Sequence, residues 1–114
     1  MNKPKTIVYV ASETMGRGDD ELGAVLIAVF LDTLSQLKGK LTHVLFVNAG
    51  VKLVVDDSPV LDQLRQLQDI GVELLVCGTC LNHFAIKDRM AVGTVSNMVA
   101  IVETLSQAER VIRP

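Results

Sequence analysis

Two cysteines stand three positions apart in the segment Cys77-Gly78-Thr79-Cys80, and they are the only two in the chain. The segment follows a short apolar run, residues 72–76, that has the length and composition of a buried strand. A CxxC turn after a strand puts its first sulfur at the sheet edge, where free backbone N–H groups can stabilise a thiolate. Cys77 and Cys80 are therefore the expected catalytic residues, with Cys77 as the nucleophile.

A structural role for the same cysteines stays open, because a free cysteine that ends a strand is often a small buried hydrophobic residue. The basic start of the chain precedes an apolar run, residues 7–11, that is shorter than a signal-peptide core and has no small-residue cleavage site after it. We therefore expect a cytoplasmic protein. In that compartment a cysteine pair is more often redox-active, metal-binding or catalytic than structural.

A metal site is the next alternative, because His83 follows the cysteines closely. A closed structural zinc site needs four ligands, and the only other histidine, His43, falls on an expected strand. Metal binding would therefore need a second subunit or an open coordination position, and we expect no metal and no cofactor. A nucleophilic pair of His83 with a cysteine stays open, although no third residue that would orient the imidazole is evident.

Strand-like and helix-like segments alternate along the chain. Three acids, residues 19–21, precede apolar residues at helical spacing, as is typical of a helix N-terminus. Ser58 and Pro59 form an expected N-cap and first helical position, Gly71 an expected helix stop, and Ser96 a further N-cap. The expected strands are 5–11, 41–47, 72–76, 92–95 and 110–112, the expected helices are 19–38, 58–70 and 97–105, and 81–89 is expected to be a helical turn or loop.

This alternation predicts a single α/β domain over residues 1–114, a three-layer α/β/α sandwich with a mostly parallel five-stranded sheet, flavodoxin-like in general form. Sites in such folds lie outside the carboxyl ends of the strands. We expect the loops 14–18 and 48–53 to border the cysteines there. The expected substrate-binding residues at this edge are Arg17, Asn48, Lys52, Gly78 and Thr79.

Charge and composition exclude several functions. Eleven basic and thirteen acidic residues give a formal net charge of −2, and the basic residues are scattered, so nucleic-acid binding is not expected. The longest apolar run, residues 22–31, is about half of the roughly 18 residues needed to cross a bilayer, so no membrane span is expected. Gly16-Arg17-Gly18 fits neither phosphate-loop spacing, and the acids that follow it would repel an anion.

The apolar run 22–31 predicts self-association. It carries no polar side chain, so a helix over it is apolar on all sides, whereas a helix that covers a sheet needs one apolar stripe. We expect a homo-oligomer in which helix 19–38 contributes to the interface. The face with Ala24, Ile27, Ala28 and Leu31 is expected to form that interface, and the face with Val25, Leu26, Val29 and Phe30 to cover the sheet.

Five stretches, residues 14–23, 46–53, 58–61, 77–80 and 92–98, carry a family resemblance that spans nearly the whole chain. From Lys5 onward the sequence resembles the DsrE-like sulfur-relay family, and most closely the C-terminal domain of YedF-type selenium-metabolism proteins. The resemblance implies a parallel-sheet α/β domain, here DsrE-like, that associates into oligomers. YedF-type proteins also have an N-terminal sulfur-carrier-like domain, so this chain is expected to be a stand-alone relative or a fragment.

The resemblance also implies a role for the cysteines. In sulfur-relay members a cysteine after the strand that matches Gly71-Val72-Glu73-Leu74 carries sulfur as a persulfide, and the matching residue is Cys77. Cys80 belongs to the YedF-like pattern. The expected function is sulfur or selenium relay, a sulfurtransferase-like transfer in which Cys77 accepts sulfur from a donor protein and passes it to an acceptor protein, with Cys80 resolving the product.

Two alternatives stay open. The cysteine pair could cycle between dithiol and disulfide, as in a thiol-disulfide oxidoreductase. The chain could also be a non-catalytic oligomeric binding subunit with structural cysteines.

Overall fold

The computed structural model describes residues 4–114, and its centre is a five-stranded sheet in which every neighbouring pair of strands is parallel. The sheet order is β4-β3-β2-β1-β5. This confirms the predicted α/β fold, and the boundaries of each strand lie within two residues of those expected. The strands are β1 (Thr6–Val10), β2 (Leu41–Phe46), β3 (Glu73–Cys77), β4 (Thr94–Ser96) and β5 (Arg110–Ile112).

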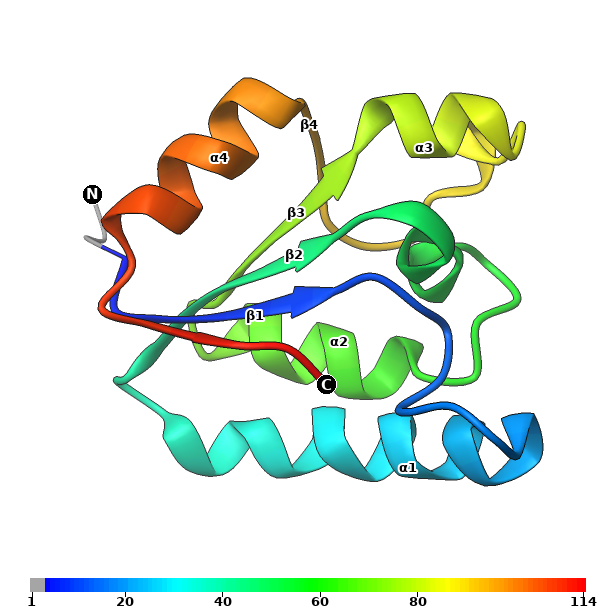
Figure 1. The fold of residues 1–114 in the computed structure, drawn as a ribbon, viewed down its shortest axis with the longest axis horizontal. Helices are drawn as coiled ribbons and strands as arrows, with labels where there is room; N and C mark the ends of the chain where they lie inside the picture. The colour runs from blue at the N-terminus through cyan, green and yellow to red at the C-terminus, as the bar shows by residue number, and fades with distance from the viewer. Residues whose placement is uncertain (1–3) are drawn as a thin grey trace.

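Helices lie on both faces of the sheet (Figure 1). On one face lie α1 (Asp20–Thr33), which continues into the short 3₁₀ helix η1 (Leu34–Leu37), and α2 (Leu61–Asp69). On the other face lies α4 (Met98–Gln107). At the carboxyl ends of the strands lie the 3₁₀ helix η2 (Asn48–Val54) and the short helix α3 (Gly78–His83), followed by η3 (Lys87–Arg89).

The core is centred on β2, which is buried along its whole length. A central strand of a parallel sheet is covered on both faces, so its residues are buried without alternation, and here this includes the polar Thr42 and His43. Phe46 and Leu45 of β2 and Leu64 of α2 are fully buried. This packing fixes the carboxyl ends of β1, β2 and β3 beside one another, which is where the cysteine segment begins.

The helix starts differ in part from the expected caps. Asp19 caps α1, with its carboxylate accepting from the Leu22 N–H at 2.8 Å. Ser58 does not cap α2, which begins at Leu61, because Ser58 Oγ accepts from the Val60 N–H within the preceding turn. That turn places Val60 in the core.

The α4 cap is also one residue later than expected. Ser96 is the last residue of β4, where it pairs with Cys77, so it is not available as a cap. Asn97 takes that role, and its Oδ1 accepts from the Ala100 N–H at 2.9 Å.

The expected orientation of α1 is wrong. Ile27 and Leu31, expected at an interface, face the core and are at most 2% exposed. The run 22–31 has no polar side chain to mark the outer face, so the sequence pattern fits both orientations. The helix does expose an apolar surface, as expected, but on its opposite face. This outer α1 face consists of Leu22, Val25, Leu26 and Val29, each 41–57% exposed.

The apolar face of α4 is narrower than expected. Of its apolar residues only Ile101 is buried, and Leu105 is partly buried against the core. Met98, Val99 and Val102 face outward, with Val99 73% exposed. Within residues 4–114, no helix combines the length and apolar character needed to span a membrane.

Candidate functional site

The cysteine segment forms the junction between β3 and α3. Cys77 ends the strand, and Gly78 begins the helix. At Gly78 a side chain would contact Val95 Cγ1 at 3.1 Å and the Ser96 carbonyl oxygen at 3.3 Å, so glycine lets β4 lie close against this turn. Both sulfurs are thereby held at the carboxyl edge of the sheet, as predicted.

The two free thiols differ in exposure. Cys77 is 3% exposed and belongs to the core cluster, whereas Cys80 is only partly buried. Cys80 lines a cavity of about 270 Å³, here called the cysteine cavity, together with Asn48, Thr79, His83 and Phe84. Cys80 is therefore the more accessible of the two thiols, whereas the sequence led us to expect Cys77 as the nucleophile.

A backbone hydrogen bond reaches the Cys80 sulfur from η2. The Asn48 N–H donates to Cys80 Sγ at 3.1 Å. Asn48 holds a φ of 50°, in the left-handed region that asparagine tolerates better than most residues. This bond joins two segments 32 residues apart in the sequence and confirms that the loop 48–53 borders the cysteines.

The close approach of η2 to β1 depends on Gly50. A Cβ at this position would overlap the Val10 carbonyl oxygen and lie 3.0 Å from the carbonyl carbon. The same oxygen accepts from the Val47 N–H at 3.0 Å, which holds it in place. Gly50 thus allows the backbone position from which Asn48 contacts Cys80.

The environment of Cys80 raises its pKa above the usual value for a thiol. Burial is the main cause, and the neighbouring Cys77 thiol adds to it, while the hydrogen bond from Asn48 acts in the opposite direction. Burial disfavours the charged form, and a backbone N–H donor stabilises it. Cys80 is therefore mostly a protonated thiol at neutral pH, and the Asn48 bond is strongest after it loses its proton.

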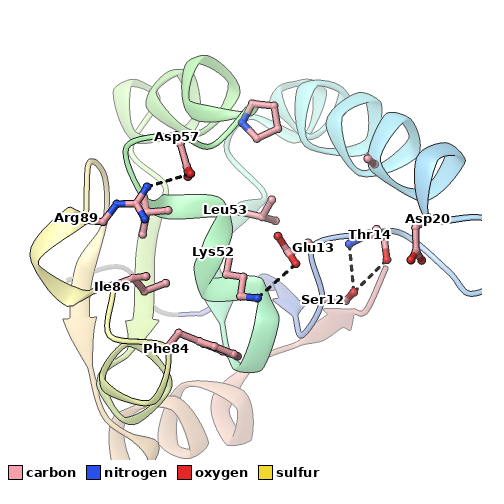
Figure 2. A pocket seen from close by; sticks show the side chains of 13 residues that line it. Ser12, Glu13, Thr14, Asp20, Lys52, Leu53, Asp57, Phe84, Ile86 and Arg89 are labelled. Carbon is pink, nitrogen blue, oxygen red and sulfur yellow. Dashed lines mark hydrogen bonds and ion pairs between the residues drawn. The ribbon is translucent and has the colours of Figure 1, made fainter.

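A second, larger cavity of about 730 Å³, here called the donor-side cavity, lies at the same edge (Figure 2). Lys52 of η2 and Glu13, from the loop after β1, face one another in it, with Nζ and Oε2 3.9 Å apart. Lys52 Nζ also lies 4.5 Å from the centre of the Phe84 ring. Phe84 lines both cavities, so the two are neighbours with a common wall.

The structure brings together most of the expected site residues. Asn48 and Thr79 line the cysteine cavity with Cys80, and Lys52 lines the donor-side cavity. Thr14, from the loop 14–18, lines the donor-side cavity, whereas Arg17 is exposed and lines neither.

Several residues of these cavities were not among the expected site residues, and Glu13 and Phe84 are two of them. His83 was already considered as a partner of the cysteines, and it shares a helix face with Cys80 because residues three apart do so. Phe84 and Glu13 reach the site through tertiary packing that no sequence pattern indicates.

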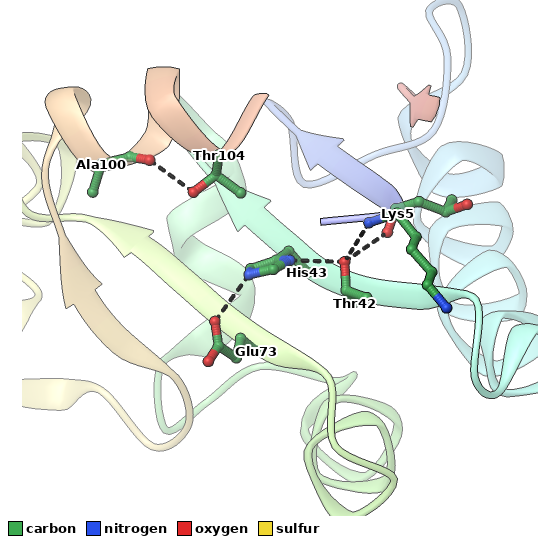
Figure 3. Close-up of polar contacts among 7 residues, drawn as sticks. Lys5, Thr42, His43, Glu73, Ala100 and Thr104 are labelled. Atoms are coloured by element: carbon green, nitrogen blue, oxygen red, sulfur yellow. Dashed lines mark hydrogen bonds and ion pairs between the residues drawn. The ribbon is translucent and has the colours of Figure 1, made fainter. Parts of the chain in front are cut away.

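A separate polar cluster lies at the amino ends of the strands (Figure 3). The buried His43 ring contacts Glu73 Oε2 at 2.9 Å and Thr42 Oγ1 at 2.8 Å. Thr42 Oγ1 in turn accepts from the Lys5 N–H. Both ring nitrogens are thus engaged within the sheet, so this histidine has a structural role. Across residues 4–114, no three His, Cys, Asp or Glu side chains gather as metal ligands would.

Comparison with solved structures supports the fold of the chain, and comparison with a family profile establishes its family. No curated protein matches the chain. The crystal structure of the ychN protein from E. coli is similar with a TM-score of 0.71 and 14% identity, covering 96% of this chain and 99% of the other. The structure of MTH1491, a protein of unknown function from Methanobacterium thermoautotrophicum, is similar with a TM-score of 0.70 and 20% identity, covering 97% and 99%. These identities support the fold alone. The sequence profile of the DsrE/DsrF-like family matches residues 5–114, and the chain belongs to that family.

Proposed function

We propose that the protein is a sulfur-relay carrier that receives a sulfane sulfur at Cys80 and hands it on as a persulfide. Family membership supports relay in general. The observation that carries the assignment to Cys80 is its position: a partly buried sulfur beside a cavity, with the Asn48 N–H aimed at it. This backbone donor stabilises the thiolate, which is the form that reacts, and so offsets part of the effect of burial, which raises the pKa of Cys80.

Loading is a redox-neutral exchange. The Cys80 thiolate attacks the outer sulfur of a donor persulfide, a new S–S bond forms, and the donor leaves as a thiolate that takes up a proton. An acceptor thiolate then attacks the outer sulfur held on Cys80, and Cys80 leaves as the thiolate.

Cys77 has a second role in this scheme. Its thiol lies next to Cys80, where it affects the pKa of that residue. When it attacks the inner sulfur of a Cys80 persulfide, a Cys77–Cys80 disulfide forms and hydrosulfide leaves. Cys77 therefore limits the lifetime of a persulfide that finds no acceptor.

The cargo and partners follow from the resemblance to the C-terminal domain of YedF-type proteins. Selenium in place of sulfur would use the same exchange, and donor and acceptor proteins would dock at the carboxyl edge. We propose further that the chain forms a homo-oligomer through the outer α1 face, which is apolar and exposed.

A thiol-disulfide oxidoreductase is the second candidate, and the proximity of the two free thiols favours it. One experiment separates the two functions. The protein is incubated with a cysteine desulfurase and cysteine and examined by intact mass spectrometry, and its insulin-reducing activity is measured in parallel. Relay predicts a gain of one sulfur atom and negligible insulin reduction. Insulin reduction without a sulfur adduct would contradict relay and support the oxidoreductase.

A further inference from the structure

We infer that the donor-side cavity binds a low-molecular-weight sulfur donor with a zwitterionic α-amino acid head, such as the hydropersulfide of cysteine. The inference rests on the proposed function, because it names a donor for the same thiol. It adds a second route of loading that needs no donor protein.

The size and lining of the cavity suit a small molecule. Its volume of about 730 Å³ falls within the range of about 300–1,000 Å³ typical of ligand sites. Leu53, Ile86 and Phe84 give it an apolar wall, and charged side chains lie among them. Such a mixture binds a ligand that has a short apolar part and a charged head.

The charges in the cavity match a zwitterion. Lys52 and Glu13 are 40% and 50% exposed, and at 3.9 Å they are too far apart for a hydrogen bond. Within residues 4–114 neither side chain makes a hydrogen bond, so each can still engage a ligand charge. An α-carboxylate fits the ammonium of Lys52, and an α-ammonium fits the carboxylate of Glu13.

The other basic residue of the cavity is already engaged. Arg89 Nη2 lies 2.7 Å from Asp56 Oδ1 and 3.0 Å from Asp57 Oδ2. The Arg89 guanidinium is therefore paired with these carboxylates and lines the cavity without an unpaired positive charge for a ligand. Asp20 adds a further negative charge to the lining, which disfavours a simple anion such as thiosulfate. Lys52 and Glu13 thus select a ligand that carries both signs.

Phe84 connects the head-group site to Cys80. Its ring centre lies 4.5 Å from Lys52 Nζ, and Phe84 lines both the donor-side cavity and the cysteine cavity. The adjacent His83 ring packs edge-on against it, with 5.1 Å between the ring centres. In the inferred complex, a ligand whose head binds Lys52 and Glu13 places its sulfur beside Phe84, which is the residue that the two cavities share.

The transfer balances without an added oxidant. The Cys80 thiolate attacks the outer sulfur of the hydropersulfide, the S–S bond of the donor breaks, and the electron pair leaves with the cysteine sulfur. The leaving thiolate takes up a proton and departs as cysteine, while the sulfane sulfur stays on Cys80.

Binding is tested with S-methyl-L-cysteine, which has the same head and an unreactive thioether. Titrated into the ¹⁵N-labelled protein, it should shift the amide signals of Glu13, Lys52 and Phe84 in a saturable way. Its N-acetyl derivative lacks the ammonium and should bind about fivefold more weakly. Lys52→Met keeps an unbranched side chain over Phe84 but removes the charge, and it should weaken binding about tenfold.

Lys38→Met is the matched control, because Lys38 is exposed and lies just before β2, at the other end of the sheet. It should bind like the wild type. The absence of saturable shifts, or unchanged binding by Lys52→Met, would overturn the inference. If loading from a desulfurase persisted in that case, the relay function would stand without this site. If S-methyl-L-cysteine bound saturably but no donor produced a persulfide on the protein, both the relay function and the role of the cavity in binding a sulfur donor would be wrong.

Discussion

Replacing Gly50 by alanine should separate η2 from β1 and weaken both the fold and the site. The new Cβ would lie 3.0 Å from the Val10 carbonyl carbon and closer to the oxygen. Carbon atoms are in optimal contact at about 3.5–4.0 Å, so the two segments must move apart by at least about 0.5 Å. The carbonyl cannot turn away without losing the hydrogen bond from Val47.

The expected cost combines two effects. Overpacking in a well-packed region costs about 1–3 kcal/mol, and a lost or strained backbone hydrogen bond costs about 1 kcal/mol. We therefore expect Gly50→Ala to reduce the free energy of unfolding by about 3 kcal/mol. In a domain of this length 1 kcal/mol changes Tm by about 4 °C, so Tm should fall by about 12 °C.

Thermal unfolding by circular dichroism measures this change, and Gly71→Ala is the control. Gly71 has a φ of 95° and no atom within 4 Å of an added Cβ, so alanine there costs only the left-handed backbone conformation, about 1 kcal/mol. The same movement should carry Asn48 away from Cys80 and slow alkylation of that thiol at neutral pH. If Gly50→Ala melts within about 2 °C of the wild type, the packing argument is wrong.

Three further predictions follow from named contacts. Cys77→Ala removes a neighbour that raises the pKa of Cys80, so we expect the pKa of Cys80 to fall and iodoacetamide to alkylate it faster at neutral pH. An unchanged dependence of the alkylation rate on pH would contradict this. Asn48→Gly keeps the N–H donor and permits the positive φ, so the alkylation rate of Cys80 should stay within about twofold of the wild-type rate. A much lower rate would assign the effect to the asparagine side chain instead of the backbone N–H. Val25→Glu should dissociate the proposed homo-oligomer in light scattering, and an oligomer indifferent to it would exclude the outer α1 face. Ile27→Ala truncates a buried side chain instead, and it should cost about 2–4 kcal/mol in urea unfolding.

The sequence predicted the strands and the position of the cysteines because both depend on local patterns. A buried parallel strand is rich in apolar residues without alternation, and residues 44–46 of β2 follow this pattern. Gly71 ends α2 with a φ of 95°, as its position after the last apolar residue indicated. The placement of the CxxC segment at the carboxyl edge then follows from the parallel sheet.

The rest depends on tertiary packing. Which face of α1 is buried could not be predicted, because Leu22 and Ile27 are equally apolar and only their neighbours distinguish them. The exposure of Cys80 over Cys77 depends on how α3 turns at the end of β3. The approach of Lys52 to Phe84 joins η2 to the end of α3, two segments that have no common sequence signal.

The central claim is that Cys80 is the thiol that receives sulfur, and single-cysteine variants test it most directly. Cys77→Ser and Cys80→Ser are each incubated with a cysteine desulfurase and cysteine, and the gain of one sulfur atom is followed by intact mass spectrometry over time. The account predicts that Cys77→Ser acquires the adduct and keeps it longer than the wild type, because no neighbouring thiol can displace it, while Cys80→Ser acquires none. A sulfur adduct that persists in Cys80→Ser and disappears in Cys77→Ser would contradict the account and assign the acceptor role to Cys77.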